Sequence, residues 1–185
     1  MTIIAAAYSE THYAIACDTN SSSSWTKGKS QTKIFCLNEE VLVGYTGTYL
    51  LDHWIQAHMA KVLMGHTLRE AAFNAWDEWR SFSRTRGHGK TNNDGELSIP
   101  GSIIVINPSG LFTCQTDGSI LEHFDYTATG SGQFVALGSF HRAFNEPSYL
   151  LKNPVGVIVE EAVEAAIHHT PFCGGEIKSI CLEKK

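Results

Sequence analysis

The apolar and polar residues of this sequence follow two periods, one typical of strands and one typical of helices. Apolar runs bounded by turn residues predict strands at 2–9, 13–17, 30–37, 41–44, 102–107, 111–115, 120–124, 126–129 and 176–182. Only the turn residues Glu10, Thr11 and His12 separate the first two runs. These two strands are therefore expected to form a hairpin.

Helical periodicity occurs in two parts of the chain. Apolar residues three and four positions apart predict helices at 48–64, at 67–84, from 133 onward and at 154–168. Thr67 followed by Glu70 has the pattern of a capping box at the start of the second helix. The short link between the first two helices predicts an antiparallel pair, with Trp54, Trp76 and Trp79 in the core or in a subunit contact.

The order of these elements indicates the fold class. Four strands, two helices, four strands, two helices and one strand follow one another, with the polar residues 86–95 expected as a mobile loop. This order predicts an α+β protein with a four-layer αββα sandwich, in which two antiparallel sheets lie between helix layers. Residues 1–185 are expected to form a single domain.

Composition limits the partners and the compartment. The formal net charge is -5 and the basic residues are scattered, which argues against a nucleic-acid-binding surface. No apolar stretch has the length of a membrane span and the first residues lack the pattern of a signal peptide, so we expect neither membrane insertion nor export. The five cysteines form no CxxC pair, and this odd count predicts reduced thiols and a cytoplasmic protein.

The first candidate for chemistry is Thr2, which directly follows Met1. If Met1 is removed, Thr2 carries a hydroxyl and a free α-amino group, and the amine can take the hydroxyl proton as the oxygen attacks a carbonyl. The pKa of an α-amino group lies near ~7.7–8, so a fraction is unprotonated near neutral pH. We expect maturation to need only the removal of Met1. The alternative is an ordinary protein start without catalytic meaning.

Three further residues are candidates because of where the predicted strands bring them. The hairpin carries Asp18 back to the level of Thr2, and Lys33 begins the third strand. A lysine cation near Thr2 would lower its pKa, and a carboxylate would hold that lysine in place. Gly47 follows the fourth strand, where its N–H can meet an oxyanion. The alternatives are a turn-capping aspartate, a solvated lysine at a strand edge and a plain turn glycine.

Six short motifs, in this order and spacing, resemble those of a known family. They are Thr2-Ile3-Ile4, Ala16-Cys17-Asp18, Gln31-Thr32-Lys33-Ile34, Gly44-Tyr45-Thr46-Gly47, Ala128-Thr129-Gly130-Ser131-Gly132 and Phe172-Cys173-Gly174-Gly175. The chain resembles, over essentially its whole length, the proteasome β-subunit family and the bacterial HslV peptidase, which are N-terminal-nucleophile hydrolases. Its short length favours the HslV-like proteins or the beta-proteobacterial proteasome homologue group.

The resemblance implies a role for five residues of the catalytic centre. Thr2 is then the nucleophile, and Asp18 and Lys33 are its charged neighbours. Ser131, between two glycines, helps to hold the threonine amine, and the N–H of Gly47 meets the oxyanion.

The resemblance also implies a substrate-binding mode and exposes a departure. Residues around Ser22 pair with an extended substrate as an added strand, and Tyr45 lines the pocket for the side chain before the cut bond. The family's late loop commonly supplies an acidic residue and a serine near the threonine amine. Here these positions read Thr170 and Cys173. Thr170 carries no charge, so Ser131 and Lys33 are expected to position the amine.

These features predict a self-compartmentalising threonine-type endopeptidase that hydrolyses peptides or unfolded proteins by acyl transfer. The resemblance implies a homo-oligomeric double ring of twelve or fourteen subunits, and such rings often need an ATPase unfoldase as partner. No metal and no cofactor are expected, because the histidines show no HExxH pattern. Two alternatives stay open: a non-catalytic ring-forming subunit, and an N-terminal-nucleophile amidase that acts on a small amide.

Overall fold

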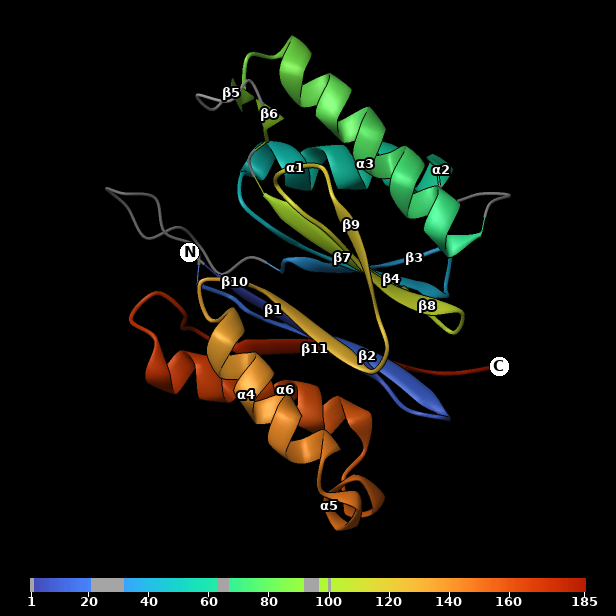
Figure 1. The fold of residues 1–185 in the computed structure, drawn as a ribbon, viewed down its shortest axis with the longest axis vertical. Helices are drawn as coiled ribbons and strands as arrows, with labels where there is room; N and C mark the ends of the chain where they lie inside the picture. The colour runs from blue at the N-terminus through green and yellow to red at the C-terminus, as the bar shows by residue number, and fades with distance from the viewer. Residues whose placement is uncertain (1, 21–31, 63–66, 92–96, 100) are drawn as a thin grey trace.

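The protein consists of two β-sheets packed face to face, with helices on both outer faces, as the computed structural model in Figure 1 shows. The structure describes residues 2–20, 32–62, 67–91, 97–99 and 101–185. The helices of the first half of the chain cover one sheet, and those of the second half cover the other (Figure 1). The predicted four-layer αββα sandwich is therefore confirmed.

The first sheet has four antiparallel strands and carries the start of the chain at one of its ends. Its order is β10-β1-β2-β11, with β1 at Ile3–Tyr8, β2 at His12–Asp18, β10 at Tyr126–Gly130 and β11 at Ile177–Glu183. Ile3 pairs with Gly130, and Asp18 pairs with Ile177. Thr2 precedes β1 and therefore lies at the same end of the sheet as the last residues of β2 and β10.

The second sheet has five antiparallel strands. Its order is β3-β4-β7-β8-β9, with β3 at Ile34–Leu37, β4 at Val41–Thr46, β7 at Ser102–Asn107, β8 at Gly110–Cys114 and β9 at Ile120–His123. Ile34 pairs with Gly44, so Lys33, just before β3, lies at the end of the sheet where β4 finishes.

A glycine allows the two sheets to approach each other near this end. A Cβ atom on Gly44 would lie 2.5 Å from Ile4 Cγ2 and 2.7 Å from Ile15 Cδ1, so no larger residue fits without movement. This contact joins β4 to the β1–β2 hairpin and brings the Thr2 end of β1 beside the start of β3.

The helices on the five-stranded sheet match the predicted positions with one difference in type. The predicted helix at 48–64 is a succession of α1 at Tyr49–Trp54, a π-helical turn η1 at Ile55–Met59 and α2 at Ala60–Val62, and α3 follows at Leu68–Thr85. The capping box is confirmed, since Thr67 Oγ1 accepts from Glu70 N and Glu70 accepts from Thr67 N. Trp54, Trp76 and Trp79 are buried core residues, as predicted.

The helices on the four-stranded sheet include one that the sequence did not reveal. They are α4 at Gln133–Phe144, α5 at Pro147–Lys152 and α6 at Val155–His169. α5 has six residues, which is too few for an apolar stripe of helical period to be recognised in the sequence. None of the helices in the described ranges is both long and apolar enough to cross a membrane.

The prediction of a loop at 86–95 is partly wrong. Lys90–Thr91 forms a strand, β5, which pairs with β6 at Leu97–Ser98. This two-stranded ribbon lies beside the helix layer of the five-stranded sheet (Figure 1). Residues 92–96 lie outside the described residues.

Candidate active site

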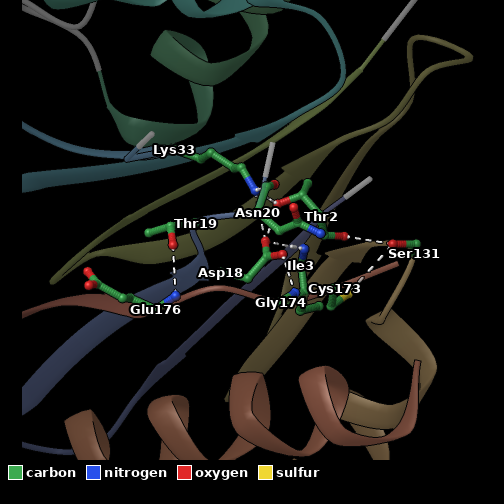
Figure 2. A network of polar contacts seen from close by, with 10 residues as sticks. All are labelled: Thr2, Ile3, Asp18, Thr19, Asn20, Lys33, Ser131, Cys173, Gly174 and Glu176. Atoms are coloured by element: carbon green, nitrogen blue, oxygen red, sulfur yellow. Dashed lines mark hydrogen bonds and ion pairs between the residues drawn. The ribbon is translucent and has the colours of Figure 1, made fainter. Parts of the chain in front are cut away.

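Three side chains meet at the end of the sandwich where β1 begins: they come from the residue before β1, the last residue of β2 and the residue before β3. The Thr2 hydroxyl donates a hydrogen bond to Asp18 Oδ1 and accepts one from Lys33 Nζ (Figure 2). Thr2 is 7% exposed, Asp18 is fully buried and Lys33 is 6% exposed. The structure thus brings together the three residues that the sequence predicted.

Asp18 is held by donors on both of its carboxylate oxygens. Oδ1 accepts from Lys33 Nζ at 2.9 Å and from Ile3 N at 3.0 Å, and Oδ2 accepts from Gly174 N at 3.0 Å. A carboxylate this deeply buried needs such partners to offset its desolvation. Hydrogen bonds from three separate segments therefore fix Asp18 in the site. An aspartate that only capped a turn would not need partners from distant segments.

Lys33 points inward, in contrast to a solvated lysine at a strand edge. Besides its contacts with Thr2 and Asp18, its ammonium donates to the carbonyl oxygen of Asn20 at 2.6 Å. Its own carbonyl accepts from Tyr45 N at 3.0 Å, so the neighbouring strand β4 fixes the backbone from which the side chain extends. The ammonium has three oxygen partners, as its three N–H bonds allow.

The main chain of Thr2 is held by the turn after β10. Ser131 donates to the Thr2 carbonyl oxygen twice, from its N–H at 2.8 Å and from its Oγ at 3.2 Å. Gly130 has a φ of 108°, and a Cβ atom on it would lie 2.2 Å from the Thr2 oxygen. The turn therefore requires glycine at this position, both for its backbone conformation and for the close approach of Thr2.

Cys173 and Gly47 lie at the borders of the site. Cys173 is buried and its Sγ lies 3.6 Å from Ser131 Oγ, so it is linked to Thr2 through Ser131. Gly47 follows the end of β4, is exposed and has a φ of 116°, a conformation that favours glycine. The preceding residue, Thr46, reaches Gly130, since a Cβ on Gly130 would lie 3.3 Å from Thr46 Cγ2.

Two candidates occupy other surroundings, and one lies outside the described residues. Tyr45 is 4% exposed and packs among the residues between β4 and the helices α1 and α3, with its ring stacked on Phe35. Burial, followed by the negative charge of Asp52, raises its pKa. Thr170 caps the end of α6, where its hydroxyl donates to the Ala166 carbonyl at 2.7 Å. Ser22 is not among the described residues.

The site includes main-chain groups that sequence reasoning missed. The carbonyl of Asn20 and the N–H of Gly174 bind Lys33 and Asp18, and any residue type offers such groups. Only the late Cys173-Gly174-Gly175 motif pointed to this region. Within the described ranges, no cluster of three His, Cys, Asp or Glu side chains is arranged to hold a metal ion.

A thiol next to the site offers no competing nucleophile. Burial raises the pKa of Cys17 to about 11, and the backbone of Lys33 and its charge offset only part of this. The thiolate, which is the nucleophilic form of cysteine, is therefore scarce near neutral pH. Of the groups that meet here, the Thr2 hydroxyl is the one with a cation and a carboxylate on its oxygen.

Comparison with known proteins supports the fold. No protein-family model and no curated protein sequence matches this chain. Among solved structures, BPH of Thiobacillus denitrificans in complex with epoxomicin superposes with a TM-score of 0.81 at 19% identity, covering 99% of each chain. BPH of the same organism in a second structure gives a TM-score of 0.83 at 19% identity, covering 99% of this chain and 98% of that one.

A third solved structure extends the comparison to a eukaryote. HslV of Trypanosoma brucei superposes with a TM-score of 0.77 at 17% identity, covering 98% of this chain and 99% of that one. The chain therefore has the fold of these BPH and HslV structures, the fold that the sequence resemblance implied.

Proposed function

We propose that the protein is a threonine peptidase whose nucleophile is Thr2, exposed as the N-terminal residue when Met1 is removed. The observation that carries this proposal is the position of the Thr2 hydroxyl, bonded to both Lys33 and Asp18 in a buried site. A threonine that merely started a strand would have no need of a buried ion pair on its hydroxyl. This argument is also the reason to prefer a catalytic protein to a non-catalytic ring subunit.

The reaction is acyl transfer in two steps. The α-amine of Thr2 takes the hydroxyl proton as Oγ1 attacks the substrate carbonyl, and Lys33 favours the developing negative charge on that oxygen. The amine then gives the proton to the departing amino group, leaving an ester on Thr2. Water, deprotonated by the same amine, attacks the ester. The bond between the acyl group and Oγ1 breaks, the acid leaves, and the amine returns the proton to Oγ1, which restores the Thr2 hydroxyl. Asp18 fixes Lys33 throughout, at 2.9 Å.

Two other parts of the site have distinct proposed tasks. Ser131, which Cys173 contacts, holds the Thr2 main chain and so aims its amine. The N–H of Gly47 binds the oxyanion of each tetrahedral intermediate. Tyr45, a buried residue of β4, is given the floor of the pocket for the substrate side chain before the cut bond. The residues around Ser22 are proposed to pair with the extended substrate as an added strand.

The proposed substrates are peptides and unfolded proteins, and the proposed assembly is the double ring of twelve or fourteen subunits that the resemblance implies. An ATPase unfoldase would then feed the ring. The similarity of the whole chain to BPH and HslV structures supports this extension at the level of the fold.

Hydrolysis assays with the wild type and two variants of Thr2 test the proposal. Wild type and Thr2→Ser keep a hydroxyl on the first residue and are expected to cleave fluorogenic peptides and casein. Thr2→Val keeps the shape and the amine but lacks the hydroxyl, and is expected to be inactive. Activity in Thr2→Val would overturn the proposal. A wild type that hydrolyses only small amides would instead support the amidase.

A further inference from the structure

A chain of three hydroxyl groups crosses between the two sheets beside Thr2. Thr46 Oγ1 lies 2.8 Å from Ser102 Oγ, and Ser102 Oγ lies 2.6 Å from Thr129 Oγ1. Thr46 and Ser102 face each other on β4 and β7 of one sheet, whereas Thr129 belongs to β10 of the other. All three residues are buried, with exposed fractions of 8%, 5% and 4%.

Polar groups in this position are unexpected for a sandwich core. Further along the same interface the sheets meet through apolar side chains such as Ile15, Leu42 and Ile106. Buried hydroxyls contribute less to stability than apolar groups of the same shape unless they are hydrogen-bonded, and even then the net gain is small. The hydroxyl chain therefore invites an explanation other than packing.

One end of the chain is attached to the glycine turn. Thr46 directly precedes Gly47, and Gly101 directly precedes Ser102. Gly101 has a φ of 96°, and a Cβ on it would lie 2.4 Å from the backbone carbonyl oxygen of Thr46 and 3.5 Å from Gly47 Cα. The backbone at 101–102 is thus packed against the Thr46–Gly47 turn, and the hydroxyl bond to Ser102 fixes the turn from the side.

The other end is attached to the turn that holds Thr2. Thr129 directly precedes Gly130, which lies against the carbonyl oxygen of Thr2. The next residue, Ser131, donates two hydrogen bonds to the same carbonyl oxygen. Thr129 also pairs with Ile4 across β10 and β1. A displacement of Thr129 would therefore move the contacts on both sides of the nucleophile.

We propose that Ser102, bridging Thr46 and Thr129, is a positioning residue that fixes the distance between the oxyanion-binding glycine and the nucleophile. This role rests on the proposed function, because it concerns the geometry of Thr2 and Gly47. A donor to an oxyanion acts only when it lies at hydrogen-bond distance from the place where the charge develops. Thr2 and Gly47 belong to different sheets, so their distance depends on links between the sheets, and the three hydroxyls form such a link next to Gly47.

The protein offers a matched control for the interpretation that the hydroxyls only stabilise the fold. Thr113 and Thr127 also bridge the two sheets, with Oγ1 atoms 3.3 Å apart, and they are 1% and 3% exposed. Thr127 pairs with Ala6, whereas Thr129 pairs with Ile4, so the control pair lies further from Thr2 along β1. Thr113 Oγ1 also lies 2.9 Å from His123 Nε2, so removing this hydroxyl tests what the loss of buried polar contacts does at a place away from Thr2.

The experiment compares Thr129→Val, Thr129→Ser and Thr113→Val in steady-state peptide hydrolysis and in urea unfolding. Valine keeps the shape of threonine, and Ser102 keeps its bond to Thr46. We expect Thr129→Val to lower kcat at least about tenfold with KM unchanged, because small misplacements of catalytic groups are costly. Thr129→Ser retains the hydroxyl and is expected to remain within about twofold of wild type, as is Thr113→Val.

Thr46→Val breaks the same link from its other end and is expected to reproduce the loss, without adding to that of Thr129→Val in the double variant. Equal kcat in Thr129→Val and Thr113→Val, or an equal loss in Thr129→Ser, would overturn the positioning role and leave the proposed function intact. A wild type that cleaves no peptide and reacts with no threonine-directed probe would overturn the proposed function, and this role with it.

Discussion

Asp18 Oδ1 lies 2.9 Å from Lys33 Nζ, in an ion pair whose two members are almost completely removed from solvent. The same carboxylate oxygen and the same ammonium also share the Thr2 hydroxyl. A buried ion pair gives little net stability, but losing one partner leaves an uncompensated buried charge. The pair therefore links the stability of this end of the sandwich to the state of the nucleophile.

Removing either charge is expected to lower both stability and activity. Lys33→Met and Asp18→Asn should each decrease the free energy of unfolding by about 3–5 kcal/mol, because each leaves the other charge buried alone. Urea unfolding measures this, and peptide hydrolysis should be lost in both variants. The double variant should regain part of the stability and none of the activity. A Lys33→Met protein with wild-type turnover would contradict the role given to the ammonium.

A methyl group on Gly130 is expected to displace Thr2. Gly130→Ala places a Cβ 2.2 Å from the Thr2 oxygen on a backbone with a φ of 108°. We expect strong destabilisation in thermal unfolding and loss of peptide hydrolysis, since the turn can no longer hold the Thr2 carbonyl.

Gly138, in the middle of α4, is the matched control for this substitution. A Cβ there meets no atom within 4 Å, so Gly138→Ala should stabilise the protein by about 0.5–1 kcal/mol through helix propensity alone. Equal effects of the two substitutions would show that contact with Thr2 is not the cause.

The Ser131 hydroxyl is expected to affect catalysis more than folding. Ser131→Ala removes the hydrogen bond of 3.2 Å from Ser131 Oγ to the carbonyl oxygen of Thr2. It keeps the bond of 2.8 Å from the Ser131 backbone N–H to the same oxygen. We expect kcat/KM to fall about tenfold, because the amine of Thr2 is less well aimed. Ser109→Ala, which removes a hydroxyl from an exposed turn, should leave kcat/KM unchanged. Equal values of kcat/KM in Ser131→Ala and Ser109→Ala would contradict a role of the Ser131 hydroxyl in the site.

His123 is expected to make stability depend on pH on the acidic side of neutrality. Burial lowers its pKa, and its Nε2 lies 2.9 Å from Thr113 Oγ1. Because its pKa is lower in the folded than in the unfolded protein, the unfolded chain binds the proton first. The stability is therefore complete above about pH 6.5 and is lost as the pH falls below that value.

Urea unfolding between pH 7.5 and 5.5 measures this dependence. His123→Asn should flatten the pH profile relative to wild type. Identical profiles of wild type and His123→Asn would contradict the assignment to His123.

The meeting of Thr2, Asp18 and Lys33 could be predicted from the sequence, Asp18 by strand geometry and Lys33 mainly by the family resemblance. A short turn between β1 and β2 returns Asp18 to the level of Thr2, and the start of β3 brings Lys33 to the same end. The four-layer order followed from the same periodicities. These predictions depend on local patterns and on a connection rule, both of which a sequence carries.

Other parts of the site depend on contacts between segments distant in sequence. The N–H of Gly174 binds Asp18 across 156 positions, and nothing in the residue type announces such a contact. Ser102 lies outside all motifs, and only the approach of β7 to β10 shows that it faces Thr129. Thr170 was predicted near the threonine amine, but its hydroxyl binds the end of α6.

The intact mass of the purified protein, before and after reaction with an epoxyketone, tests the central claim most directly. An epoxyketone can close a ring with a hydroxyl and an amine of one residue, so a stable adduct requires both groups on an N-terminal threonine. The account predicts loss of Met1 and a single adduct on Thr2 that is absent from Thr2→Val. A retained Met1, or a processed Thr2 that takes no adduct, would contradict the account and favour a non-catalytic ring subunit.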